Sequence, residues 1–406
     1  MSDNHSNQVT DEGKMNKDEI IRDEGQYLMQ TYRRADMVLE RGEGVYLYDT
    51  DGRRYLDFMS GIAVAALGHS DPEVAAAVAE AAATLTHVSN LYYTIPQVEL
   101  AKRLVTHSFA DRVFFTNSGG EAVEGALKFA RKRAHAGGKT GKHEIVAFNS
   151  GFHGRTMGAL SVTYKSAYRE PFAPLLPGVC FAPFNDVAAA RALIGPATCA
   201  VIVEPVQGEG GIHAATPAFL RELRALCDEY GATLIFDEIQ CGLGRTGRLW
   251  AHEAHDVTPD IMTLAKPLAN GLPIGAILMT EEVASAVNYG EHGSTFGGGP
   301  LVCHAANVVF DRIARPECLA AVAANGEYLC NRLRELNNPH VLDVRGAGLL
   351  VGVDLDMPAA QVMVAARAKG LLVINAGETT LRIAPPMIVT KEQIDEAVQV
   401  LAECLS

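Results

Sequence analysis

The spacing of apolar and polar residues predicts a small sheet, followed by helices, in the N-terminal part of the chain. Residues 42–58 alternate apolar and polar positions around a turn at Asp51-Gly52, which is the pattern of a β-hairpin. Helical spacing follows from Asp71 to about His87 and again over residues 96–107. We therefore expect an N-terminal segment over residues 21–70, after which a second region begins.

From about residue 113 the pattern becomes strand, glycine-containing turn and helix, repeated. The apolar residues 113–115 precede a turn at Ser118–Glu121, and the apolar positions after this turn share one helical face. Residues 145–148 and 200–203 are short and entirely apolar, as buried parallel strands tend to be. This repetition predicts an α/β fold.

A further unit of the same kind ends at a candidate ligand site. A helix is expected to begin at Thr216-Pro217 and to end at Gly231, just before the apolar run 233–236. Asp237 follows this run, and the carboxyl ends of strands are where open α/β sheets bind ligands. We assign residues 71–302 to one large, ligand-binding domain.

The two ends of the chain have different patterns. From about residue 303, helical spacing, short strands around 349–353 and a closing helix near 391–405 predict a smaller α+β domain over residues 303–406. Residues 1–20 are polar and acidic, without the features of a targeting signal, and are expected to be a disordered tail.

Composition narrows the class of protein. The 406 residues are 48% hydrophobic and 20% charged, as in an ordinary globular protein with a large core. A net charge of −13 argues against a surface for nucleic acid or anionic membranes. The 8 cysteines lack metal-ligand spacing and are expected to be reduced thiols. Because no apolar run is long enough to cross a bilayer, we expect a soluble cytoplasmic protein.

Lys266 and Asp237 are the strongest candidates for chemistry. Both follow apolar, strand-like runs in the same region of the chain. A lysine for an aldehyde and a carboxylate for a pyridinium nitrogen are what pyridoxal phosphate requires of a protein. Taken alone, a lysine is usually solvated surface charge, and an acid at a strand end is often a helix cap. Gln240, three residues after Asp237, is placed to bond the phenolic oxygen of the cofactor ring.

Other segments supply anion-binding and stacking groups. The glycines of Ser118–Glu121 and the helix that follows suit a phosphate, although a tight turn without a ligand has the same sequence. Phe152 offers a flat ring that can stack on another ring, and Arg155 offers a guanidinium that can bind a carboxylate at two points. Phe152 could equally be a core residue and Arg155 a surface charge. Two acids occur in Glu204–Glu209, and Arg382 is a plausible ion-pair partner for one of them.

In this order, these features resemble the class III (ω-amino acid) aminotransferases of pyridoxal-phosphate fold type I, over about residues 24–405. The family implies a large domain with a central, mostly parallel seven-stranded sheet flanked by helices, and a smaller domain built from both ends of the chain. The Asp237 and Lys266 pair with Gly242–Gly247 is specific to the class. Three segments resemble the branch that acts on acetylornithine: Gly61–Val64, Ala66–His69 and His87–Tyr93.

The resemblance implies which residues bind the cofactor. Lys266 is expected to bind its aldehyde covalently and then to move a proton at the substrate carbon, while Asp237 pairs with the ring nitrogen. Phe152 is expected to stack on one face of the ring and Ile239 to pack on the other. Phosphate contacts are implied for Ser118, Gly119, Gly120 and, from the neighbouring subunit, Thr295. The site is therefore expected at a homodimer interface.

The resemblance also implies how substrates are held. Arg155, with Ser294 nearby, is expected to anchor the carboxylate of acetylornithine, and Arg382 the α-carboxylate of glutamate. Glu209 is expected to cover Arg382 while an ω-amine is bound, because an exposed arginine would attract every α-amino acid. No metal is expected.

Three positions depart from the family pattern. Gly120 stands where threonine or alanine is usual, so a side-chain hydroxyl contact to the phosphate is lost there. Gly299 replaces the usual asparagine, and Ala35-Asp36 replaces a more familiar turn. These departures concern substrate detail rather than the chemistry.

The implied activity is a ping-pong transfer of the δ-amine of N-acetylornithine to 2-oxoglutarate, a step of arginine biosynthesis. Succinylornithine, ornithine, 4-aminobutyrate and N-succinyl-diaminopimelate are alternative substrates for the same chemistry. An aminomutase would use the same cofactor without needing 2-oxoglutarate. A protein that kept the fold and lost the activity is a further alternative, which the complete set of site residues disfavours.

Overall fold

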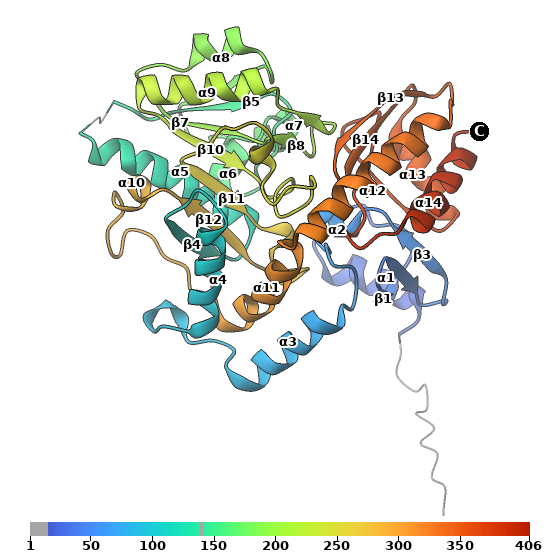
Figure 1. The fold of residues 1–406 in the computed structure, drawn as a ribbon. Helices are drawn as coiled ribbons and strands as arrows, with labels where there is room; N and C mark the ends of the chain where they lie inside the picture. The colour runs from blue at the N-terminus through green and yellow to red at the C-terminus, as the bar shows by residue number, and fades with distance from the viewer. Residues whose placement is uncertain (1–14, 139–140) are drawn as a thin grey trace, which may run out of the picture.

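Seven strands form the central sheet of the computed structural model, which describes residues 15–138 and 141–406 (Figure 1). β12 runs antiparallel to both of its neighbours, and the other neighbouring pairs are parallel. The expected α/β class and the mostly parallel seven-stranded sheet are therefore confirmed. In spatial order the strands are β4 (Arg112–Thr116), β12 (Gly275–Met279), β11 (Ile261–Leu264), β10 (Thr233–Asp237), β7 (Thr198–Val203), β5 (Glu144–Phe148) and β6 (Val179–Ala182).

Helices cover both faces of this sheet, which is why its strands are apolar on both sides. Ala200 and Ile202 of β7 join the core cluster that contains α5 (Gly119–Ala136). Val201 and Val203, which point to the opposite face, join the cluster that contains α9 (Pro217–Tyr230). The remaining helices near the sheet are α6 (Met157–Ser161), α7 (Ser166–Arg169), η2 (Glu170–Phe172), α8 (Val187–Leu193), η3 (Ala251–Ala254), η4 (Lys266–Ala269) and α10 (Glu281–Ala284).

The ends of α5 and α9 follow from local sequence. Ser118 is the N-cap of α5, and its Oγ accepts a hydrogen bond from the backbone N–H of Glu121 at 3.2 Å. Thr216 caps α9 in the same way, and Gly231 ends it in the left-handed conformation, at φ 64°. Both expected helix starts are confirmed.

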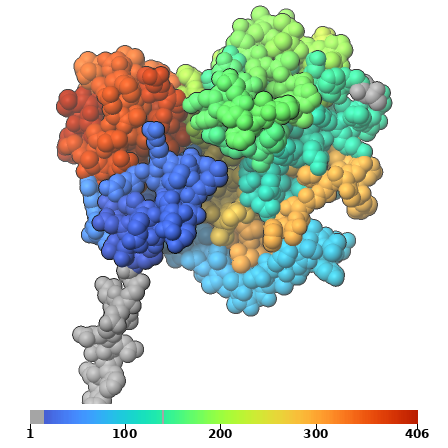
Figure 2. Space-filling model, turned by 180° about the vertical axis from the view of Figure 1, so that it is seen from behind, coloured from blue at the N-terminus to red at the C-terminus, as the bar shows by residue number. Residues whose placement is uncertain are grey.

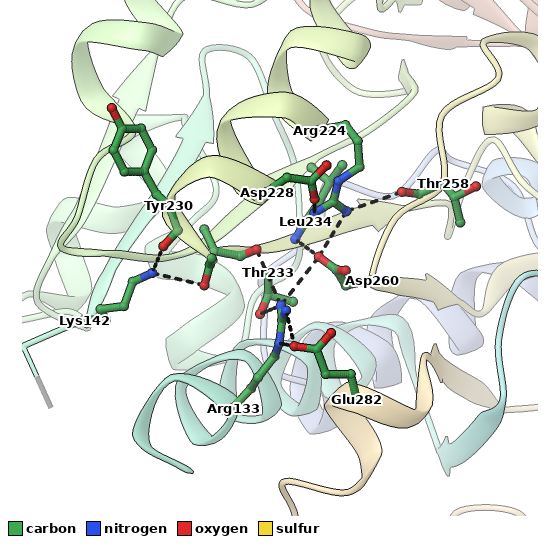
Figure 3. Close-up of polar contacts among 12 residues, drawn as sticks. Arg133, Lys142, Arg224, Asp228, Tyr230, Thr233, Leu234, Thr258, Asp260 and Glu282 are labelled. Carbon is green, nitrogen blue, oxygen red and sulfur yellow. Dashed lines mark hydrogen bonds and ion pairs between the residues drawn. The ribbon is translucent and has the colours of Figure 1, made fainter. Parts of the chain in front are cut away.

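A polar network holds the amino ends of β10 and β11 (Figure 3), whereas Asp237 lies at the carboxyl end of β10. The carboxylate of Asp260 accepts hydrogen bonds from the backbone N–H of Leu234 at 2.7 Å and from Arg224 at 3.1 Å. Arg133 lies 3.7 Å from the same carboxylate and 2.7 Å from Glu282. The network joins α5, α9 and α10 to the sheet, so it supports the fold away from the site.

The smaller domain combines the N- and C-terminal parts of the chain (Figures 1 and 2). Its first sheet pairs three N-terminal strands with β15 (Leu371–Leu372), which lies parallel to β3. The N-terminal strands, which include the expected hairpin, are β1 (Leu39–Glu43), β2 (Tyr46–Asp49) and β3 (Arg54–Asp57). The second sheet contains β13 (Val341–Ala347), β14 (Leu350–Leu355), β17 (Thr380–Ile383) and β16 (Ile374–Asn375), with helices α12 (Pro316–Glu335), α13 (Ala359–Ala368) and α14 (Lys391–Cys404) beside them.

Two element bounds differ from the domain limits drawn from the sequence. Helix α1 (Lys17–Tyr27) crosses the limit at residue 20, because Asn16 and Glu19 form a capping box. Residues 1–14 of the expected tail lie outside the described residues. The limit at residue 302 falls inside α11 (Pro300–Ile313), which packs against α3 (Pro72–Thr84) and α4 (Ile95–Thr106) and so belongs with the large domain.

Short elements complete the described chain: α2 (Ser60–Ala63), η1 (Ser89–Leu91), β8 (Val206–Gln207) and β9 (His213–Ala214), the last two forming a ribbon of their own. None of the helices in residues 15–138 and 141–406 combines the length and the apolar character that a membrane span requires.

Candidate active site

A cavity of about 200 Å³ lies where the carboxyl ends of the parallel strands meet. It brings together residues from segments more than a hundred positions apart in the chain, including most of the cofactor-binding residues expected from the sequence. Its lining consists of Gly119, Gly120, Phe152, His153, Gly154, Glu204, Asp237, Ile239, Gln240, Ala265 and Lys266.

Lys266 begins η4 directly after β11, and it faces this cavity. Within the described chain, its ammonium has neither a hydrogen-bond nor an ion-pair partner. Burial lowers the pKa of Lys266, although the charges of Glu209 and Asp237 oppose this shift. A lowered pKa increases the fraction of neutral amine, which is the form that attacks an aldehyde.

Asp237 ends β10 and is 3% exposed. One carboxylate oxygen accepts hydrogen bonds from the hydroxyl of Thr263 and from the backbone N–H of Ile239, both at 3.1 Å. The other lies 2.8 Å from Nδ1 of His153. Because a carboxylate only accepts, Nδ1 carries the proton in this pair. These contacts fix the orientation of the carboxylate in the cavity wall.

His153 is a site residue that the sequence analysis did not identify, and Glu204 was considered there only as one of two possible ion-pair partners of Arg382, which pairs with Glu209 instead. Burial lowers the pKa of His153, but the hydrogen bond and charge of Asp237 outweigh it, and the pKa is raised overall. Burial raises the pKa of Glu204 to about 7. The Glu204 carboxylate accepts from the backbone N–H groups of Phe152 at 3.0 Å and Gly208 at 3.1 Å, so it holds two segments of the site. Its position at the end of a buried strand was the one available signal.

The start of α5 forms a cradle for an anion. The first N–H groups of a helix have no partner within the helix, and here they belong to Gly119 and Gly120, which line the cavity. A Cβ at position 119 would lie 2.8 Å from Cδ1 of Ile239, so a side chain there would push Ile239 into the cavity. Ser118 caps the helix, and its predicted contact with a phosphate stays a prediction.

The expected ion pair between Arg382 and Glu209 is confirmed. Nη1 of Arg382 lies 2.5 Å from the Glu209 carboxylate, 3.1 Å from the carbonyl of Gly208 and 3.0 Å from the side-chain oxygen of Gln240. Arg382 is only 1% exposed, and its Nε has no partner in the described chain. The guanidinium therefore retains donor capacity for a carboxylate.

A second cavity, of about 570 Å³, adjoins the first, and Phe152 lines both. Its walls come from residues 150–152 and 163–168 of the large domain, from 209–211, and from 375–380 of the small domain. The exposed Arg155 lies near its rim, with the guanidinium 3.5 Å from the ring centre of Tyr168, which lines this cavity. Arg155 is thus well placed to meet a carboxylate that enters from this side.

Ser294 and Thr295 lie outside both cavities of this chain. Ser294 Oγ accepts hydrogen bonds from the side chain of Asn117 at 3.2 Å and from the backbone of Gly297 at 2.9 Å. No contact within the described chain places it beside Arg155, and because the site is expected at a dimer interface, its place near Arg155 stays a prediction. Thr295 is exposed, so its expected contact with a neighbouring subunit stays a prediction.

The residues that line the first cavity fit pyridoxal phosphate. Lys266 and Asp237 are suited to its aldehyde and ring nitrogen, Phe152 and Ile239 to its two faces, and the start of α5 to its phosphate. The fit rests on Lys266, which has no partner in residues 15–138 and 141–406, and on the close packing that excludes a side chain at position 119.

Comparison with known proteins shows which proteins this chain is similar to. The aminotransferase class-III family model matches residues 27–405. The chain is 55% identical to the mitochondrial acetylornithine aminotransferase of Alnus glutinosa, covering 95% of this chain and 87% of that protein. It is 46% identical to acetylornithine aminotransferase of Methanocaldococcus jannaschii, covering 96% and 98%.

Solved structures agree with the observed fold. The ornithine aminotransferase from Toxoplasma gondii superposes with a TM-score of 0.92 at 31% identity, covering 97% of this chain and 96% of that one. The N-acetylornithine aminotransferase from Stenotrophomonas maltophilia gives a TM-score of 0.82 at 36% identity, covering 95% and 98%.

Proposed function

We infer that this chain, which belongs to the aminotransferase class-III family and uses pyridoxal phosphate, transfers the δ-amine of N-acetylornithine to 2-oxoglutarate. The products are N-acetylglutamate semialdehyde and glutamate. The observation that carries this proposal is that Lys266, without a partner among the described residues, lines one cavity with Asp237, and that the Arg382–Glu209 pair adjoins this cavity through Gln240. The relatives named acetylornithine aminotransferase support the choice of substrate. We place the activity in arginine biosynthesis and in the cytoplasm.

When bound, pyridoxal phosphate supplies an aldehyde for the substrate amine and a ring that withdraws electrons from the neighbouring carbon. Lys266 would hold the cofactor aldehyde through its neutral amine, a form that its lowered pKa favours, and would then carry the proton that leaves the substrate carbon. Asp237 would accept a hydrogen bond from the ring nitrogen, and His153 holds the Asp237 carboxylate in place for this contact.

Arg382 and Glu209 allow one site to accept two kinds of amine. While Glu209 covers Arg382, the guanidinium is neutralised and does not attract an α-carboxylate, so the ω-amine of the donor is presented instead. In the second half-reaction, the carboxylate of 2-oxoglutarate displaces Glu209 and binds Arg382. Arg155 binds the carboxylate at the far end of acetylornithine.

A homodimer would complete the site and cover an apolar surface. Several large apolar side chains near residues 91–95 are strongly exposed in the single chain, including Leu91 at 84% and Tyr93 at 100%. The ring of Phe296 is 66% exposed and directly follows Thr295. Exposed patches of this kind mark interaction sites. Association through this surface would place Thr295 at the phosphate of the partner's site.

Absorbance of the purified protein with bound cofactor tests this function. Adding N-acetylornithine alone should convert the aldehyde form to the amine form in a single turnover, and adding 2-oxoglutarate should restore it. The absence of both changes would rule out the proposed reaction.

Ornithine is a second candidate donor, because a solved ornithine aminotransferase superposes closely. Comparing kcat/KM for the two donors decides between them. A pocket that distinguishes an acyl group by apolar contact alone gives a ratio of only about 10–200.

A further inference from the structure

The segment Gly208–Ile212 carries Glu209, and its first residues pack closely against the large domain. A Cβ on Gly208 would lie 2.3 Å from the side chain of Gln240, and one on Gly210 would lie 2.7 Å from the carbonyl of Ser150. Gly211 and Ile212 both have left-handed backbones, at φ 100° and 57°. These close approaches place Gly208 and Gly210 against the large domain, and Gly211 and Ile212 continue the segment toward the small domain.

Arg345 of β13 holds the other end of this segment from the small domain. Its Nε donates to the carbonyls of Gly211 at 2.9 Å and Ile212 at 3.1 Å, and its Nη2 donates to Gly211 at 2.5 Å. Ile212 is a β-branched residue with a left-handed backbone, where an external contact compensates for conformational strain. Among the described residues, no other arginine bonds this segment apart from Arg382.

Acidic residues of the small domain fix the Arg345 guanidinium in turn. Asp354 makes a two-point contact with it, at 2.5 Å and 2.9 Å, and Asp343 makes a third contact at 2.9 Å. Asp354 also accepts from the hydroxyl of Thr380 at 2.5 Å, and Thr380 lies two residues before Arg382 in β17. One network therefore links the strand that carries Arg382 to the segment that carries Glu209.

The larger cavity provides the space into which Glu209 can turn. Glu209, Gly210, Gly211 and Thr380 line this cavity of about 570 Å³, and the Glu209 side chain is 34% exposed. The Glu209 side chain can therefore turn away from Arg382 by rotation about its own bonds. It returns to the same place on Arg382 only if its backbone stays fixed. Arg345 supplies that condition.

We propose that Arg345 is a positioning residue that fixes the backbone under Glu209, and so sets the preference of the site for ω-amines over α-amines. This inference rests on the proposed function. Without Arg345 the segment loses three hydrogen bonds, and Glu209 no longer returns to one place on Arg382. The uncovered Arg382 then admits α-carboxylates when an ω-amine should bind.

The test compares Arg345→Met with Arg332→Met, measuring each half-reaction separately by single-turnover absorbance. Arg332 is a matched control, because it also lies in the small domain and pairs with two acids, Asp395 and Glu335, far from the Glu209 segment. In Arg345→Met, the ratio of kcat/KM for acetylornithine to kcat/KM for glutamate should fall about threefold to tenfold, mainly through a higher KM for acetylornithine. Arg332→Met should leave this ratio unchanged.

A double-mutant cycle shows whether Arg345 acts through Glu209. In a Glu209→Gln background, Arg345→Met should cause no further change in the ratio. Independent effects of the two substitutions on this ratio, or an equal loss in both half-reactions, would overturn the inference.

If Arg345→Met does not fold, Arg345→Lys replaces it in the test, because one ammonium cannot reach both Asp354 and the two carbonyls. An unchanged ratio in Arg345→Lys would then also overturn the inference. A wild-type protein without either half-reaction would instead overturn the proposed function.

Discussion

At the scale of single residues, Asp237 and Lys266 line the same cavity but differ in the number of hydrogen bonds that the protein makes to them. Asp237 receives three hydrogen bonds, whereas Lys266 receives none within the described chain. Burial lowers the pKa of the lysine, and the carboxylate is held as a fixed acceptor. This contrast is what a covalent cofactor site needs.

Replacing Lys266 with alanine should reduce turnover by at least about 10³-fold, because both the nucleophile and the proton carrier are removed. Circular dichroism should show an unchanged fold, since Lys266 lines a cavity and bonds no described neighbour. Near-normal turnover in this variant, measured with acetylornithine and 2-oxoglutarate, would contradict the assigned role.

Glu204 predicts a pH dependence of stability. Burial raises the pKa of its carboxyl from 4.5 to about 7, so its contribution to stability is complete below the unfolded value and is lost as the pH rises through 7. Glu204→Gln does not titrate. Its free energy of unfolding relative to the wild type should therefore increase by about 1–3 kcal/mol between about pH 5 and about pH 8. Urea unfolding at both pH values measures this difference, and a constant offset would contradict the raised pKa.

The roles of single residues were only partly accessible from the sequence. Lys266, Asp237 and Phe152 could be predicted because their residue types suit one cofactor and their positions follow strands. His153 and Glu204 could not be assigned, because a histidine in a loop and an acid after a strand are common. Only the folded chain shows that they bond Asp237 and the backbone of Phe152.

At the scale of elements, the strand ends and helix starts that build the site are those with the clearest local signals. The caps of α5 and α9 were predictable because Ser118 and Thr216 precede apolar helical faces. The direction of β12 was not, because a strand buried on both faces has the same pattern in either direction. Helix α1 was missed because its capping box lies in a polar segment without buried residues.

The polar network in Figure 3 should stabilise the fold without affecting the chemistry. Asp260→Ala leaves Arg224 and Arg133 without a shared acceptor at a mostly buried position, and it should cost about 2–4 kcal/mol. Because the site lies at the carboxyl ends of the strands and Asp260 at their amino ends, kcat of the folded variant should stay within about twofold of the wild-type value. Thermal unfolding and steady-state kinetics together check this, and a large fall in kcat with unchanged stability would contradict it.

At the scale of the whole molecule, the single chain leaves an apolar surface exposed around residues 91–95. This surface could not be predicted from the residue pattern, because exposed apolar residues from different segments form a patch only after folding. The family resemblance supplied the expectation of a dimer, and the exposed residues near 91–95 are consistent with it.

Tyr93→Asp should therefore weaken association and lower cofactor retention together. Leu342→Asp is the control, because Leu342 is 65% exposed on the small domain, away from this surface. Light scattering after size-exclusion chromatography, with absorbance of the bound cofactor, reports both quantities. A dimeric Tyr93→Asp variant with full cofactor content would show that this surface is not the interface.

The most direct measurement of the central claim is the location of the covalent cofactor bond. The protein with bound pyridoxal phosphate is reduced with borohydride, digested and analysed by peptide mass spectrometry. The account predicts a pyridoxyl group on the peptide that contains Lys266, and its loss when acetylornithine is added before reduction. A label on another lysine, or none, would contradict the account.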